Sequence, residues 1–169
     1  GLRGAVLAAG TAFLGATIAV QGLAGSISLA ADFERELNVF RVTAGASADE
    51  MERVGEVARE LGRDISLPGV SAIDAAQAMS LLARAGLDVG DALEAARGTL
   101  QLATAAQIDN AQATELVANA LNAFRLDGTE ATRVADLLAG AANESQGSIL
   151  DMGIALRQAA AAASVVGIS

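Results

Sequence analysis

The fold class follows from residues 47–62, SADEMERVGEVARELG. Ser47 precedes Glu50 by three residues, which is the spacing of a helix capping box. Apolar side chains then recur at steps of three and four, at Met51, Val54, Val57 and Leu61. Gly62 ends this pattern, and Pro68 marks the loop beyond it. The stretch therefore predicts an amphipathic α-helix with a defined start and stop.

Similar units repeat toward the C-terminus at intervals of about 20 residues. Helix starts are predicted at Ser71 with Asp74, Asp88, Asp109 with Gln112, Thr129 and Ser148. The predicted inward-facing residues are Ile73, Ala76, Met79, Leu82, Ala83, Val89, Leu93, Ala96, Leu100, Ala103, Leu116, Val117, Ala120, Leu121, Phe124, Val134, Leu137, Leu138, Ala141, Met152, Leu156, Ala159, Ala163 and Val166. No alternating β-branched run appears between turn signals. The sequence thus predicts an all-α fold with about six short amphipathic helices packed as hairpins.

The apolar content is unusual in kind. Hydrophobic residues make up 53% of the chain, but aromatic residues only 2%, and the rest is mostly Ala with Leu, Val and Ile. Small side chains each bury little area, at roughly 25 cal/mol per Å² of apolar surface. A thin core of this kind would gain from self-association or from an enclosing partner.

Residues 5–31 contain no charged side chain. As a helix this run would span about 40 Å, more than the roughly 30 Å hydrocarbon core of a bilayer. Its glycines and its small residues at four-residue spacing equally suit a helix buried in a bundle or homo-oligomer. The sequence therefore predicts one long apolar helix at residues 1–31, either buried or membrane-competent, followed by a helical module at residues 32–169.

The residues offer little for catalysis. There is no His and no Cys, which removes imidazole bases, thiol nucleophiles and the usual zinc ligands. Carboxylates cluster at Glu34 and Glu36, and at Asp49, Glu50 and Glu52, but acidic residues near a helix N-terminus are mainly structural. We therefore predict no catalytic, cofactor-binding or metal-binding residues, and no enzyme activity.

The net charge of −9 argues against a nucleic-acid partner, because phosphate contacts need clustered basic side chains. The 11 basic residues are spaced singly along the chain and form no basic stripe. We therefore expect no sequence-specific binding of nucleic acid. The chain also starts with Gly1 and not with Met, which suggests a fragment of a much longer polypeptide.

Several motifs in order resemble the conserved helical region of phage tail tape measure proteins. The matching stretches are residues 31–38 (ADFERELN), 43–47, 58–62, 71–79 (SAIDAAQAM), 82–86, 100–105, 120–124, 134–139 and 141–143. Each motif alone is only Ala-rich helix, whereas the ordered set is specific. The resemblance covers about residues 31–169.

This resemblance implies a structural virion protein of the tail lumen or tip. Such proteins set tail length, are coated by tail assembly chaperones in the host cytoplasm, and leave the tube on infection to assist genome delivery. The implied partners are further copies of the chain, with a trimer favoured, the tail tube protein, distal tail or hub proteins, and the host membrane during ejection. Because the predicted helices are short, residues 47–169 suit a compact anchoring module better than the ruler itself.

Two other function classes are open to the sequence. A membrane-active, pore-forming helical protein would use residues 5–31. A peptidoglycan hydrolase is disfavoured by the missing His and by the absence of a cleft-forming motif set.

Overall fold

The computed structural model describes residues 28–145 and 149–166, and within these ranges the chain is helical and has no β-strand. The all-α prediction is therefore confirmed. The chain divides into two units, residues 1–35 and 36–169. The apolar segment predicted at residues 5–31 lies outside the described part except for residues 28–31, which begin a helix over 28–44. Among the helices of the described residues, none has the length and apolar character to cross a bilayer.

The helices after this first one start where the sequence predicts. They are α2 (Ala48–Leu61), α3 (Ala72–Arg84), α4 (Val89–Ala106), α5 (Asn110–Phe124), η1 (Gly128–Glu130), α6 (Ala131–Ser145) and α7 (Ile149–Val166). One start differs in detail, because a 3-10 turn, η1, precedes α6 where the sequence predicts a helix from Thr129. Residues 32–166 therefore contain the six predicted amphipathic helices, with an additional helix at 28–44.

Side-chain caps explain these starts. Ser47 and Glu50 form a reciprocal capping box on α2, and Ser71 and Asp74 form one on α3. At α5 the Asp109 carboxylate accepts a hydrogen bond from the Gln112 amide at 2.8 Å. Each cap satisfies backbone N–H groups that have no partner inside the helix, which is worth about 1 kcal/mol per helix.

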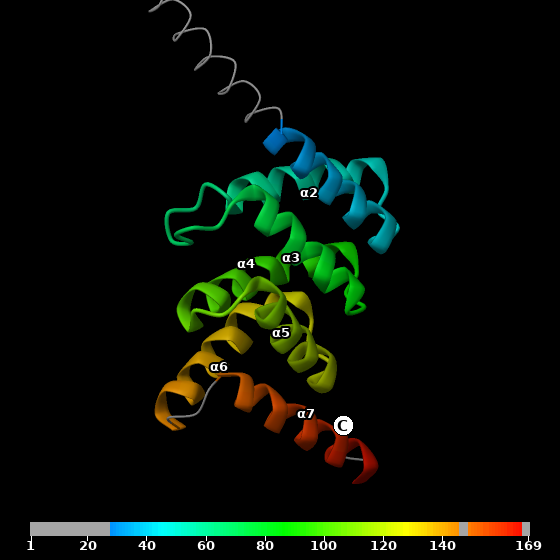
Figure 1. Cartoon of the computed structure of the whole chain (residues 1–169). Helices are drawn as coiled ribbons and strands as arrows, with labels where there is room; N and C mark the ends of the chain where they lie inside the picture. The colour runs from blue at the N-terminus through cyan, green and yellow to red at the C-terminus, as the bar shows by residue number, and fades with distance from the viewer. Residues whose placement is uncertain (1–27, 146–148, 167–169) are drawn as a thin grey trace, which may run out of the picture. The chain divides into compact units, whose positions relative to one another are not determined.

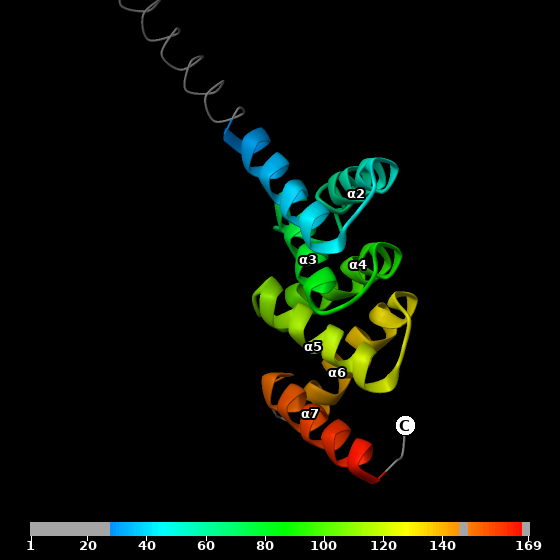
Figure 2. The ribbon, with the colours of Figure 1, turned by 90° about the vertical axis from the view of Figure 1, so that its right-hand side faces the viewer.

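Within residues 36–169 the helices stack in the order of the sequence. Each of α2, α3, α4 and α5 packs against both the next α-helix and the one after it, and α6 packs against α7. Figures 1 and 2 show this succession from α2 to α7 in two perpendicular views. Such nearest-neighbour stacking is the arrangement of helical repeat proteins.

Four connectors between helices share one conformation. Each connector begins with a residue in the left-handed conformation, which is Gly45, Gly86, Gln107 or Arg125. An apolar residue follows it, and the residue after that is the N-cap of the next helix. The apolar residue donates its backbone N–H to the carbonyl five residues earlier, as for Leu87 to Leu82 and Leu126 to Leu121. This bond is the outer bond of a Schellman motif, which closes a helix and reverses the chain in few residues.

The core is built mainly of Ala and Leu, with Phe40, Met79, Leu82, Leu100 and Leu121 among its largest members. Three buried hydroxyls, on Ser80, Thr99 and Thr114, donate to carbonyls four residues earlier in their own helices. In the described residues every buried side-chain nitrogen or oxygen atom has a hydrogen-bond partner. Polar side chains are thus accommodated between closely packed helices without a desolvation penalty.

Among the described side chains, three residues that were predicted to face inward are exposed, namely Phe124, Leu137 and Ala159. Phe124 is 58% exposed and Leu137 is 64% exposed. Phe124 is the last residue of α5, where the chain turns through left-handed Arg125. Leu137 adjoins Leu138, and because adjacent helical residues point about 100° apart, only Leu138 faces the core. Seven further predicted inward-facing residues are only half-buried: Met51, Val57, Ile73, Ala83, Ala141, Met152 and Leu156. The side chains of Ala163 and Val166 lie outside the described part of the chain.

Two glycines allow helix backbones to touch. A Cβ atom on Gly98 of α4 would lie 2.5 Å from the Thr132 nitrogen and 2.7 Å from the Ala131 carbonyl carbon of α6. A Cβ atom on Gly128 would collide with the backbone of Asp91 in α4. These contacts set the position of α4 relative to η1 and α6. The interface between α4 and α6 is the most extensive one between two helices in the stack.

Candidate functional site

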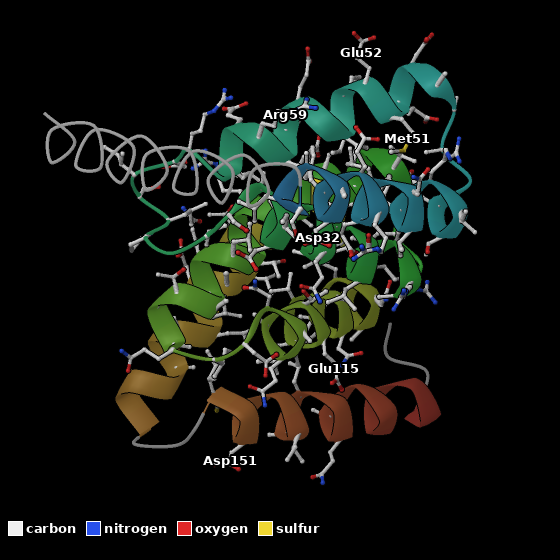
Figure 3. The ribbon with its side chains drawn as sticks, turned by 45° about the horizontal axis from the view of Figure 1, so that its top comes forward. Asp32, Met51, Glu52, Arg59, Glu115 and Asp151 are labelled. Atoms are coloured by element: carbon white, nitrogen blue, oxygen red, sulfur yellow. The ribbon has the colours of Figure 1, made fainter. Side chains whose placement is uncertain are left out.

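The carboxylates singled out in the sequence serve as helix caps or lie on the surface. The Glu50 carboxylate accepts hydrogen bonds from the Ser47 amide at 2.8 Å and the Ser47 hydroxyl at 2.6 Å. These bonds, led by the one from the hydroxyl, lower the pKa of Glu50 below its ordinary value. Asp49 and Glu52 are exposed on α2, and Figure 3 shows the Glu52 side chain pointing away from that helix. The capping box predicted at Ser47 and Glu50 is therefore present, and the Glu50 carboxylate takes part in it.

Asp64 is the most constrained carboxylate of the α2–α3 loop. It accepts hydrogen bonds from the Ser66 hydroxyl at 2.6 Å and the Ser66 amide at 2.8 Å, and it pairs with Arg97 of α4 at 2.6 Å. The Ser66 hydroxyl, followed by the Ser66 amide and Arg97, lowers the pKa of Asp64. The ion pair between Asp64 and Arg97 connects the α2–α3 loop to α4, so the Asp64 charge is balanced within the fold.

Among the shallow hollows on the described surface of residues 36–169, two have fully described linings. The larger encloses about 570 Å³ and is lined by Glu56, Arg59, Glu60, Arg63, Asp64 and Ile65. The smaller encloses about 420 Å³ and is lined by Ala44, Gly45, Glu50, Arg53, Asp88, Val89 and Gly90. Charges of both signs line each one, and neither brings a nucleophile to a base. Among residues 28–145 and 149–166, no group of three or more acidic side chains is placed to hold a metal ion.

One stabilising hydrogen bond joins residues far apart in the sequence, so no local pattern predicts it. The Asp91 carboxylate of α4 accepts the Gly128 backbone N–H at 2.8 Å, across 37 residues of sequence. Asp127, the residue at the N-cap of η1, makes no side-chain cap itself. Asp91 therefore caps the η1–α6 segment from a neighbouring helix, which a local cap pattern cannot predict.

Replacing Asp91 with alanine should lower the free energy of unfolding by about 1–2 kcal/mol, because a charge-assisted cap on a helix N-terminus is lost. The matched control is Asp136→Ala, since Asp136 is an exposed carboxylate on α6. That control should change stability by less than about 0.5 kcal/mol. Urea unfolding followed by circular dichroism measures both. Equal losses in the two variants would contradict the role of Asp91.

The lowered pKa values of Glu50 and Asp64 make the fold sensitive to acid. A carboxylate with a depressed folded-state pKa stabilises the protein above its unfolded pKa, and this stability is lost as the pH falls through the folded value. We expect Tm to fall as the pH drops below the ordinary Glu value of 4.5. In Glu50→Gln, the Tm deficit seen at neutral pH should shrink in acid, as measured by thermal melts across the range. A deficit that is the same at every pH would contradict this assignment.

The comparisons with known proteins agree on one family. The sequence profile of the family described as phage-related minor tail protein matches residues 55–169. The tape measure protein of Pneumococcus phage Dp-1 is 34% identical over 154 residues, which cover 90% of this chain but 13% of that relative's length. No solved structure matches. With a match over well more than half its length, and with the ordered motifs noted in its sequence, the chain belongs to the phage tail tape measure family.

Proposed function

We propose that residues 36–169 are a folded anchoring module of a phage tail tape measure protein, located in the tail lumen or at the tail tip. The observation that carries this proposal is family membership combined with a stack of short helices, none longer than the 18 residues of α4 and α7 among the elements with defined bounds. In this role the module holds the tape measure chain during tail assembly, while longer helical parts of the protein set tail length. Release on infection then assists genome delivery.

The geometry of a stack distinguishes an anchor from a ruler. A continuous α-helix advances about 1.5 Å per residue, so 39 residues would extend about 60 Å. The same 39 residues folded as a helix pair add one layer, which is about 10 Å thick. A folded stack is therefore a poor measure of length, and its many surfaces suit contact with neighbouring proteins.

Tail length tests this proposal directly. Residues 88–126 can be deleted in frame, which joins Leu87 to Asp127 and preserves the residue types of the connector. Electron micrographs of the resulting tails should show a change in mean length of no more than about 10 Å, or a loss of complete tails. As the control, deletion of 39 residues from a long helical part of the protein outside this chain should shorten tails by about 60 Å. Shortening by that amount in the first variant would overturn the anchoring proposal.

Cryo-EM of intact tails, focused on the lumen and tip, tests the location. Helical density for several copies inside the tube or at its tip would support the proposal and give the symmetry. An empty lumen, with the chain found elsewhere, would overturn it.

The partners follow from the proposed location. Further copies of the chain, the tube protein, distal tail or hub proteins and assembly chaperones are the proposed contacts, with three copies favoured. The thin Ala-rich core supports self-association, because small side chains leave much stability to be gained by covering the stack. Insertion of residues 5–31 into a host membrane stays a prediction from the sequence.

A further inference from the structure

The stack is open at the end formed by α6 and α7. Earlier helices are covered by the helix two places later, as α4 is by α6 and α5 is by α7. Among the described residues, no later helix covers α6 and α7 in this way. Both carry large exposed apolar side chains, with Leu137 of α6 64% exposed and Ile154 of α7 46% exposed.

A 39-residue repeat shows which surface is left open. The connectors Gly86-Leu87-Asp88 and Arg125-Leu126-Asp127 lie 39 residues apart and have the same backbone hydrogen bond. The same offset pairs four buried residues of α4 with four buried residues of α6. These pairs are Ala92 with Ala131, Ala95 with Val134, Ala96 with Ala135, and Thr99 with Leu138. The inner faces of the two helices are thus equivalent, which confirms the register of the repeat.

On a second face of the two helices, the equivalent residues are buried in α4 but exposed or half-buried in α6. Gly98 of α4, which contacts the backbone of α6, is equivalent to Leu137, and buried Leu102 is equivalent to half-buried Ala141. Leu137 therefore occupies the position at which α4 receives the helix two places later. The uncovered face of α6 is the one on which the repeat places a helix.

The α5–α7 pair gives an independent example. Leu116 of α5 packs against Gly153 of α7, and Leu116 and Ala120 are buried. Their equivalents at the same 39-residue offset are Ala155 and Ala159 of α7, and both are exposed. The uncovered faces of α6 and α7 are thus the same repeat surface, seen on two successive helices.

We propose that the next two helices of the same polypeptide cover this surface, one packing on Leu137 and Ala141 and the other on Ala155 and Ala159. The chain spans 13% of the length of its tape measure relative, so members of the family offer ample further sequence. A tethered segment also has a high effective concentration at an adjacent surface. The occupant would carry an apolar face to match Leu137 and the alanines, and it would lie farther from α6 than α6 lies from α4, because Leu137 stands where α4 has Gly98.

A second copy of the chain fits this surface less well. Head-to-tail stacking would bring residues 36–44 and α2 of one copy to α6 and α7 of another. The exposed residues of α2 are highly charged and include Glu52, Arg53, Glu56, Arg59 and Glu60. Burying these charges against Leu137 and a row of alanines would carry a large desolvation cost.

Thiol labelling in the full-length protein tests the proposal. Residues 1–169 contain no Cys, so Leu137→Cys introduces a thiol on α6 that peptide mass spectrometry can follow. Phe124→Cys is the matched control, because Phe124 is 58% exposed and Leu137 is 64% exposed. Cys at 137 should react with a maleimide on the order of tenfold more slowly than Cys at 124, since its reaction requires local opening of the stack.

Two outcomes would overturn the proposal. Equal labelling rates at the two positions in the full-length protein would mean that nothing covers α6. Slow labelling at position 137 that disappears on dilution would identify a second copy as the occupant.

As a further check, Leu137→Asp should lower hydrogen-exchange protection of α6 in the full-length protein, whereas Phe124→Asp should leave it unchanged.

Discussion

Phe40→Ala is expected to lower the free energy of unfolding by about 3–5 kcal/mol, the largest effect of any single truncation considered. Phe40 is fully buried and is the largest side chain of a core made mostly of Ala and Leu. Its removal loses apolar burial and leaves a cavity that small neighbours cannot fill by changing rotamer. Urea unfolding followed by helical circular dichroism measures the loss.

Phe124→Ala is the matched control for Phe40→Ala. The same atoms are removed from a side chain that is 58% exposed, so we expect a change of less than about 0.5 kcal/mol. Similar losses in the two variants would contradict the burial assigned to both residues. Both phenylalanines lie in apolar helical patterns, and the pattern alone wrongly predicts that Phe124 faces inward.

The parts of the fold that could be predicted are encoded locally. Ser47 with Glu50 and Ser71 with Asp74 lie within one helical turn of each other, so the sequence itself carries the capping interaction. The same holds for Asp109, whose cap bond reaches only to Gln112. Helix existence and helix starts therefore followed from spacing, without knowledge of the tertiary fold.

The parts that could not be predicted depend on residues distant in sequence. The hydrogen bond from the Gly128 amide to the Asp91 carboxylate joins residues 37 apart in sequence. The Asn122 side-chain amide likewise donates to the Ala85 carbonyl at 3.0 Å, again across 37 residues. Gln107 and Arg125 also adopt the left-handed conformation at helix ends, a position that glycine usually occupies. Stacking order and connector geometry thus emerged only from the structure.

The family followed from a resemblance of ordered motifs and not from reactive groups. Glu50 and Asp64 are held by hydrogen bonds that serve the fold, and Asp64 is also paired with Arg97. A structural protein distributes its function over surfaces whose residues are chemically ordinary. No spacing of residue types marks such a surface, and the uncovered face at Leu137 became visible only through comparison of burial between repeats.

Gly98→Ala should destabilise the protein by about 1–3 kcal/mol, although alanine is the better helix former by about 1 kcal/mol. The added Cβ atom would lie 2.5 Å from the Thr132 nitrogen, and the neighbouring atoms are backbone that no rotamer change can move. Helices α4 and α6 must therefore separate, and Gly98→Leu should separate them further and cost more. Urea unfolding, together with hydrogen exchange in α6, measures the effect.

Gly140→Ala is the control that isolates helix propensity from packing. Gly140 lies in α6, and a Cβ atom there would meet nothing within 4 Å. This variant should gain about 0.5–1 kcal/mol from propensity alone. Opposite signs for the same substitution would show that Gly98 is required by the close approach of two backbones. A stabilising effect at both positions would mean that α4 and α6 are not in contact at Gly98, and the 39-residue repeat would then give no reason to expect a helix at Leu137.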